Sequence, residues 1–565
     1  MAAHERHHEH VHDRHRRSRW WSALVVCVLL LGACGVDGGR SAAEPTTTAA
    51  PSLGGTVAAI EGAVATTGDY VADSGFRPEP DGFSFANYAN DGVTNLSATD
   101  LHQLFGDAIC DTGEGPSCTL SSPAVTWMQQ INAAMAVGHC EGLAVLSQLY
   151  HVGERDPSEH GAPRTYDLRL DGNAELQREI ARWWATQATT PASTSRNDRL
   201  SPSGVVDELR RALAGEPGLD TSYTLAIFQP GLAGGHAITP YAIEERGDGV
   251  VWIMVYDNNH PGVPRAVEVD TEADTWTYES SINPGQPESE YRGDASTNTL
   301  WLTPLTDRVR TQDCPFCAGE LAGDLDPTNQ LLLTGPGSRT AELDFYVTDP
   351  TGRTFGRREG GTVQEIPEGR FQPLLAAEPD DAPAPVLEVP AAFDLVVTLR
   401  APDGAAAQDM DLGMVGAGYD VLVDDIDLAP GETAQLFLSR DATLVGWTTE
   451  RSGTPTLDVT TGDGAGADGG ADYDVQVAAE MDEPGTLELT SPDDADVLVG
   501  ADGDAVVQLS ALRRGRDGTE RTVSGQVELQ AGEQVVLLLE GWAPGEPLGL
   551  VVLRDGQVHR RLQLE

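Results

Sequence analysis

The sequence predicts an α+β domain followed by all-β modules, and two changes of pattern along the chain carry this prediction. Apolar residues recur at helical spacing between about residues 85 and 215, and short strand-like runs between Gly and Asp turns then follow. Helices first and a sheet afterwards are typical of an α+β domain. From about residue 331 Val, Leu and Thr runs recur every eight to twelve residues without helical periodicity, which favours β-sandwiches.

The first part is expected to contain four helices, over residues 122–135, 140–150, 173–187 and 203–214. Ser122 and Pro123 are typical of a helix start, because Ser caps free N–H groups and Pro fits the first helical position. Gly138 interrupts the pattern, so the second helix is expected to begin at Cys140. Alternating or apolar runs then predict five strands, over residues 223–228, 236–244, 250–256, 265–269 and 275–278.

Residues 1–33 are expected to be a lipoprotein signal peptide. Four Arg residues between positions 14 and 19 directly precede the apolar run Trp20–Ala33, which is too short to span a bilayer as a helix. The run ends in Leu31-Gly32-Ala33-Cys34, which resembles the lipobox of bacterial lipoproteins and implies acylation of Cys34. We therefore expect an extracytoplasmic protein that is lipid-anchored to the cell membrane. An ordinary secretory signal with an accidental cysteine is the alternative.

The charge of the chain bounds its partners. The formal net charge is -52, and all 36 basic residues are Arg. Such acidity argues against nucleic acid or anionic lipid as a partner, so membrane contact is expected only through the lipid on Cys34. No cofactor and no metal site are predicted, and the oligomeric state is open.

Two disulfides are expected among the seven cysteines. Cys110 and Cys118 flank a loop rich in Gly and Pro, a spacing that a disulfide can close. Cys314 and Cys317 form a Cys-Pro-Phe-Cys motif that can close on itself. A redox pair or half of a zinc site is the alternative for that motif, but no thioredoxin-like βαβ unit or further ligands accompany it.

Cys140 is then left without a partner, provided that Cys27 is removed with the signal peptide and Cys34 is modified. An odd cysteine in an exported protein indicates a reactive thiol. The alternative is a buried, inert thiol, because free Cys is among the most buried residue types.

Cys140, His236 and Asp257 are the candidate catalytic residues, as nucleophile, general base and acid, and orienting carboxylate. A thiol attacks acyl carbons when a base removes its proton and a third group holds that base in position. Cys140 at a helix start would face free N–H groups, which favour a thiolate and can stabilise an oxyanion. His236 and Asp257 lie at strand ends one hairpin apart, so we expect them to pair.

These residues resemble the papain-like cysteine peptidases, especially the double-glycine-leader peptidase-like branch. The resemblance covers about residues 85–300 and rests on the segments Gly138–Ala144, Gly235–Ala237 and Val255–Asn259, which follow the family order Cys, His, Asp or Asn. It implies a papain-like domain that hydrolyses peptide or isopeptide bonds. The family usually has a Gln six residues before the nucleophile, where this chain has Ala134. Asn132, Gln130 or Gln129 would then complete the oxyanion hole.

The predicted organisation follows from these patterns: signal peptide 1–33, tether 34–60, papain-like domain 61–310, linker with the CxxC motif 311–330, immunoglobulin-like β-sandwich 331–452, Gly/Asp linker 453–473 and a second sandwich 474–565. The predicted function is surface-anchored, thiol-dependent acyl transfer on a peptide or cell-wall peptide substrate. Two alternatives remain open. One is a non-catalytic binding or adhesion lipoprotein, and the other is a thiol acyltransferase or transglutaminase.

Overall fold

The computed structural model describes residues 63–90, 92–280, 289–314, 316–317, 327–335, 343–375, 384–440, 442–450, 456–462, 471–481, 485–490, 496–515, 519–539, 542–543 and 545–565. The described residues all belong to one compact unit. The expected signal peptide, the tether and Cys34 lie outside the described residues. Within the described ranges, no helix is long and apolar enough to cross a membrane.

The expected α+β class with a papain-like domain is wrong, because the chain is mostly β. Of the described residues 45% lie in strands and 19% in helices, and large antiparallel sheets dominate. The helices longer than one turn have only eight to thirteen residues. The helical periodicity over 85–215 correctly predicted individual helices. The fold class, however, is set by the balance of helix and strand over the whole chain, and the strands outnumber the helices. The β-sandwich part of the expectation agrees with the structure.

The helices lie where side chains can cap them. Asn173 accepts the backbone N–H of Leu176 at the start of one helix, and Ser201 accepts that of Gly204 at the start of another. Gly153 adopts the left-handed conformation that ends a third. The helices are α2 (Pro78–Asp81), α3 (Ala98–Phe105), α4 (Ser122–Ala134), α5 (Cys140–Val152), α6 (Ala174–Ala185) and α7 (Pro202–Leu213).

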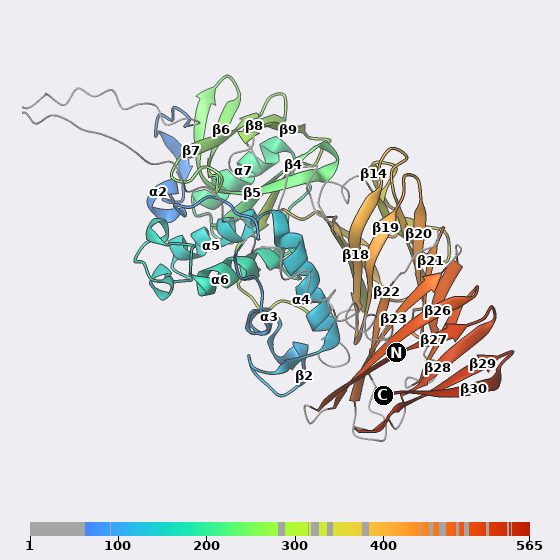
Figure 1. Ribbon diagram of the computed structural model, residues 1–565. Helices are drawn as coiled ribbons and strands as arrows, with labels where there is room; N and C mark the ends of the chain where they lie inside the picture. Colours follow the sequence, from blue (N-terminus) through green and yellow to red (C-terminus); the bar gives the residue numbers. More distant parts are fainter. Residues whose placement is uncertain are drawn as a thin grey trace, which may run out of the picture. The chain divides into compact units, whose positions relative to one another are not determined.

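One eight-stranded antiparallel sheet accompanies these helices, with α5 packed against α6 and against β5 (Figure 1). Its strands run in the order β10-β4-β5-β6-β7-β8-β9, and β1 also pairs with β5. Their bounds are β1 (Tyr70–Asp73), β4 (Tyr223–Gln229), β5 (Ala233–Gly247), β6 (Val250–Tyr256), β7 (Pro264–Asp270), β8 (Thr275–Ser280), β9 (Ser289–Asp294) and β10 (Leu300–Pro304). All five strands predicted between residues 223 and 278 are therefore present. A small hairpin, β2 (Cys110–Thr112) and β3 (Thr119–Leu120), lies before α4.

The C-terminal half consists of two larger antiparallel sheets. The nine-stranded sheet has the order β15 (Arg370–Gln372), β16 (Val386–Pro390), β11 (Thr328–Thr334), β18 (Ala407–Gly416), β19 (Tyr419–Leu428), β22 (Thr456–Gly462), β23 (Ala471–Met481), β26 (Ala505–Gly515) and β27 (Glu520–Leu529). The eleven-stranded sheet has the order β14 (Gly361–Gln364), β13 (Thr354–Arg358), β12 (Asp344–Thr348), β17 (Leu395–Arg400), β20 (Thr433–Leu438), β21 (Leu444–Thr449), β24 (Gly485–Thr490), β25 (Val497–Ala501), β28 (Glu533–Leu538), β29 (Leu548–Arg554) and β30 (Gln557–Leu564).

A single apolar core fills the space between these two sheets. Buried and partly exposed residues alternate along strands such as β28, so one face of each sheet turns inward. Among the described residues, the members of this core range from Leu331 to Leu564. β21 pairs with β24 and β19 with β22, so strands of the segments 331–452 and 474–565 share both sheets. β22 and the start of β23 also lie in the range 453–473, so part of that predicted linker is strand.

Candidate active site

Helix α5 carries Cys140 as its first residue, as predicted, and the side chain is fully buried. Of the cysteines in the described part of the chain, it alone lies outside a disulfide. The first N–H groups of a helix have no partner within it, so the N-terminus of α5 presents donors and the positive end of the helix dipole beside the sulfur. Gly142 allows close packing here, because a Cβ atom there would lie 2.1 Å from the Ile180 carbonyl oxygen of α6.

His236 and Asp257 come from neighbouring strands. β5 pairs with β6 so that Thr239 lies opposite Tyr256, which brings His236, three residues earlier, close to Asp257, one residue later. The His236 Nε2 atom lies 2.8 Å from the Asp257 Oδ1 atom, and both side chains are fully buried. The pairing predicted from the strand ends is therefore present in the structure.

Asp257 is held by donors on both of its oxygens. Besides His236, Oδ1 accepts the Asn259 backbone N–H at 2.9 Å, while Oδ2 accepts the hydroxyls of Tyr278 and Ser280 of β8, each at 2.7 Å. Burial alone would raise the pKa of Asp257, but the charge and hydrogen bond of His236, with further help from Tyr278, hold it well below its ordinary value. Asp257 is thus a carboxylate at neutral pH.

His236 is accordingly the positive partner of a buried ion pair. Burial alone would lower the pKa of His236, but the charge and hydrogen bond of Asp257, followed by a hydrogen bond and charge from Cys140, raise it to about 10. Asp257 engages Nε2, while the buried Nδ1 atom has no hydrogen-bond partner among the described residues. Asp257 and Cys140 therefore both act on the same buried imidazole.

Asn258 joins the elements that carry these three residues. Its Nδ2 atom donates to the Cys140 carbonyl at 3.0 Å and to the Ala237 carbonyl at 2.9 Å. The side chain therefore fixes the end of β6 against both the start of α5 and β5.

His139 takes no part in this group, as its place next to Cys140 suggests. Its ring stacks on Tyr88 with centroids 4.3 Å apart, and its two nitrogens lie 2.8 Å from the Tyr88 carbonyl oxygen and 2.9 Å from Asn95 Oδ1. Burial lowers the pKa of His139 to about 4, so the ring is neutral. The buried His139 is thus neutral, whereas the buried His236 is positively charged.

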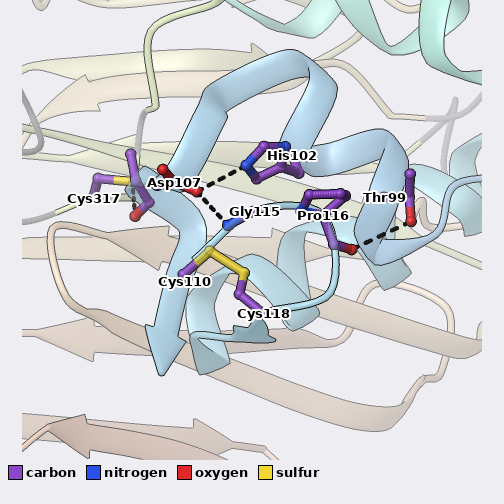
Figure 2. The surroundings of a disulfide bond; sticks show 9 residues. Thr99, His102, Asp107, Cys110, Gly115, Pro116, Cys118 and Cys317 are labelled. Atoms are coloured by element: carbon purple, nitrogen blue, oxygen red, sulfur yellow. Dashed lines mark hydrogen bonds and ion pairs between the residues drawn. A yellow bond between two sulfur atoms is a disulfide. The ribbon is translucent and has the colours of Figure 1, made fainter. Parts of the chain in front are cut away.

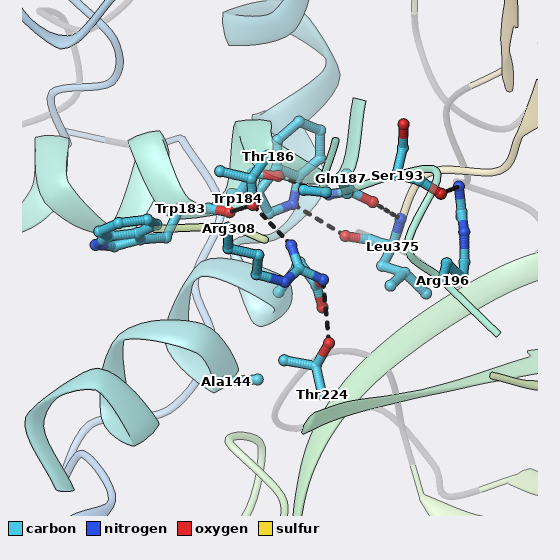
Figure 3. A network of polar contacts seen from close by, with 12 residues as sticks. Ala144, Trp183, Trp184, Thr186, Gln187, Ser193, Arg196, Thr224, Arg308 and Leu375 are labelled. Atoms are coloured by element: carbon cyan, nitrogen blue, oxygen red, sulfur yellow. Dashed lines mark hydrogen bonds and ion pairs between the residues drawn. The ribbon is translucent and has the colours of Figure 1, made fainter. Parts of the chain in front are cut away.

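A second buried ion pair fixes the first turn of α5. The Arg308 guanidinium donates to Glu141, and it also donates to Thr186 Oγ1 at 2.7 Å and to Thr224 Oγ1 at 3.1 Å (Figure 3). Both charged side chains are 1% exposed. The pair therefore ties the residue after Cys140 to β4 and to the residues after α6.

A segment from the β-rich half also reaches the sulfur. The carbonyl oxygen of Leu375 lies 3.5 Å from Cys140 Sγ. The same oxygen accepts the Trp184 indole N–H at 2.9 Å, and the Leu375 N–H donates to Gln187 at 2.7 Å (Figure 3). Nothing in the sequence near residue 375 indicates a role at the site, because the contact joins positions 235 residues apart.

The predicted oxyanion residues have hydrogen bonds elsewhere. Asn132 exchanges two hydrogen bonds with the backbone of Leu96, at 2.9 and 3.1 Å. Gln130 accepts the Thr334 hydroxyl at 3.1 Å and lies against β18. The structure therefore brings neither residue to Cys140 through a hydrogen bond, and the donor near the sulfur is Trp184, which has no motif to mark it.

Both predicted disulfides are present. Cys110 and Cys118 close the loop of the β2–β3 hairpin, which Figure 2 shows together with the contacts of Asp107. Cys314 and Cys317 are bonded to each other. Among the residues described, no group of three or more His, Cys, Asp or Glu side chains is placed to hold a metal ion.

The arrangement is suited to nucleophilic chemistry at an acyl carbon. It combines a thiol, an imidazole that holds a proton and an ionised carboxylate that orients it, all away from water. Comparison of the chain with protein-family models, with curated proteins and with solved structures gives no match.

Proposed function

We propose that this chain is a surface-anchored, thiol-dependent acyl-transfer enzyme, most simply a cysteine peptidase or amidase that hydrolyses peptide or isopeptide bonds. The single observation that carries the proposal is the buried Asp257–His236 pair, 2.8 Å long, with Cys140 as the other group acting on the imidazole. Titratable groups with strongly perturbed pKa values, such as this buried histidine beside a free thiol, gather at active sites.

The reaction proceeds in two stages. In the reactive state Cys140 is a thiolate and His236 holds its proton. The sulfur attacks the substrate carbonyl carbon, a C–S bond forms, and the C–N bond then breaks as His236 gives its proton to the leaving amine. Water next attacks the thioester and gives a proton to His236, which releases the acid and restores the ion pair. N–H groups of the first turn of α5 stabilise the oxyanion in both stages.

The competing function is a binding protein whose site does no chemistry. The full burial of Cys140 favours this alternative, because a substrate cannot reach a sulfur that is closed to solvent. Transfer to an amine is a variant of the same chemistry, and no contact of the site favours it over hydrolysis.

The test is Cys140-dependent turnover. The purified chain, its Leu375→Ala variant, which shortens the residue over the sulfur, and the Cys140→Ser variant of each are incubated at pH 7 with a pool of internally quenched peptides, and acid-quenched samples are measured by mass spectrometry. We expect cleaved peptides and an acyl adduct on Cys140 in Leu375→Ala, less of both in the natural chain, and neither in the Cys140→Ser variants. Added glycine amide separates the reactions, since a hydrolase gives the free acid and a transferase gives the amide. Cleavage that persists in Cys140→Ser would contradict the proposal.

The surface anchor is a separate part of the proposal and has its own test. It rests on the lipobox-like residues Leu31–Cys34. Metabolic labelling with an alkynyl fatty acid is expected to mark the expressed chain but not its Cys34→Ala variant. Equal labelling of both would contradict acylation at Cys34.

A further inference from the structure

The residues that close the site belong to one short segment, Arg370–Leu375, which we name the plug segment. It begins as β15, the edge strand of the nine-stranded sheet, and runs on to Leu375. Side-chain contacts fix it along its length: Arg370 pairs with Glu388, and Gln372 lies 3.5 Å from Ser193 Oγ. The plug segment is therefore a fixed part of the fold and not a loose loop.

Its last peptide group is bound as the acyl part of a substrate would be. The Leu375 carbonyl oxygen receives the Trp184 indole N–H at 2.9 Å and lies 3.5 Å from Cys140 Sγ, and its N–H is held by Gln187. A peptide substrate needs these same elements: a donor on the carbonyl oxygen, a nucleophile beside it and an acceptor for the neighbouring N–H. The sulfur contacts the Leu375 carbonyl oxygen and not the carbonyl carbon, so this contact is not a step of nucleophilic attack.

The Leu375 side chain fills an apolar site next to the catalytic group. It packs in one buried cluster with Ala144 of α5, Phe228 of β4 and Trp301 of β10. It also covers Gly235, because a Cβ atom at residue 235 would lie 2.7 Å from Leu375 Cδ2. The neighbours of Leu375 in this cluster are apolar side chains and the Cys140 thiol, so the place suits an aliphatic side chain better than a carboxylate.

We propose that the plug segment is an internal inhibitor that occupies the place of the acyl side of a peptide substrate. The site is closed while Leu375 is bound, and it accepts substrates with an aliphatic residue of leucine size at that place. This inference rests on the proposed function. Beyond that function, it specifies a substrate class, and it identifies Leu375 as the residue that keeps the site closed.

The test compares two leucines. Leu375→Ala removes the side chain that faces Cys140, while Leu332→Ala removes a leucine of similar burial that packs into the helical core, outside the plug segment. The measurement is the rate of Cys140 alkylation by iodoacetamide, read by mass spectrometry. We expect Leu375→Ala to react at least about tenfold faster than the natural chain, a factor that corresponds to about 1.4 kcal/mol, and Leu332→Ala to stay within about twofold.

A second variant guards against failed folding. Gln187→Met removes the acceptor of the Leu375 N–H without touching the plug segment itself, and it should also speed alkylation. Circular dichroism checks the fold of each variant. Equal rates in the natural chain, Leu375→Ala and Gln187→Met would overturn the inference.

A peptide probe tests the substrate class. Acetyl-Phe-Gln-Pro-Leu-Leu aldehyde copies residues 371–375. The thiol adds to its aldehyde carbon, a C–S bond forms, and the thiol proton moves to the oxygen. We expect this aldehyde, but not the same peptide with a terminal aspartyl aldehyde, to protect Cys140 of Leu375→Ala from alkylation. Equal protection by both would overturn the aliphatic preference.

The two proposals fail in different ways. Fast alkylation and selective protection in Leu375→Ala, without cleavage of any peptide, would support the plug segment and contradict hydrolysis. Alkylation that depends on His236 but is the same with and without Leu375 would support the catalytic pair and overturn the plug segment.

Discussion

Replacing His236 by Gln should change how stability depends on pH. In the natural chain the imidazole is buried against the Asp257 carboxylate, and its pKa is raised to about 10 from an ordinary 6.5. A group that binds its proton more tightly in the folded state stabilises that state as long as it is protonated. His236→Gln keeps a polar side chain of similar size but has no such proton.

The magnitude follows from the two pKa values. Their difference of about 3.5 corresponds to about 5 kcal/mol, at 1.36 kcal/mol for each pKa unit. This contribution is complete below pH 6.5 and is lost as the pH rises to about 10, at about 1.4 kcal/mol per pH unit. The pKa of Asp257 is lowered, so its contribution is lost only when the pH falls below the ordinary range of a carboxyl group.

The assay is urea unfolding followed by tryptophan fluorescence at several pH values between 6.5 and 9.5. We expect the stability difference between the natural chain and His236→Gln to shrink by about 2.7 kcal/mol from pH 7 to pH 9. His139→Gln is the matched control, because its pKa is lowered and the ring is neutral throughout this range, so its difference should stay constant. A constant difference for His236→Gln as well would refute the buried ion pair.

Three further changes test the structure around the site. Glu141→Gln leaves Arg308 buried without a charged partner, so urea unfolding should show a loss of about 3–5 kcal/mol. Gly142→Ala places a methyl group 2.1 Å from the Ile180 carbonyl oxygen and should destabilise the chain by about 1–3 kcal/mol despite the better helix propensity of Ala. Cys118→Ser opens a disulfide that joins residues eight apart and should lower the stability by about 2.5 kcal/mol.

Each of these three substitutions has a matched control at a position that lacks the tested contact. Glu154→Gln alters an exposed acid, Gly204→Ala adds a Cβ with no neighbour closer than 3.4 Å, and Ser117→Ala alters the same loop without breaking the disulfide. Each control should lose no more than about 0.5 kcal/mol of stability relative to the natural chain, and Gly204→Ala can gain up to about 1 kcal/mol from helix propensity. A loss in a test variant no larger than in its control would contradict the corresponding contact.

Local features of the site were predictable because they depend on neighbours in sequence. The Gly138 break predicts that a helix begins at Cys140, and α5 does begin there. The turn after residue 256 places Asp257 at the end of a strand, next to the strand that carries His236. The spacing of Cys110 and Cys118 likewise predicts their disulfide.

The remaining features depend on contacts between distant segments, which no local pattern encodes. Tyr278 is two strands beyond Asp257, and Trp184 has the helical spacing of an ordinary core residue. Leu375 reaches Cys140 only because β15 pairs at the edge of a sheet formed far along the chain. The predicted α+β fold class was wrong for the same reason. Strand periodicity identifies single strands, but it does not show how many strands pair into one sheet.

The most direct test of the central claim, that Cys140 and His236 form a reactive pair, is the rate of Cys140 alkylation by iodoacetamide between pH 5 and pH 9. It is measured with and without His236→Ala, in the natural chain and in Leu375→Ala. We expect Cys140 alkylation to continue below neutral pH when His236 is present and to slow strongly in His236→Ala. A rate that rises only toward pH 8–9, where an ordinary thiol ionises, and is the same with and without His236 would contradict it.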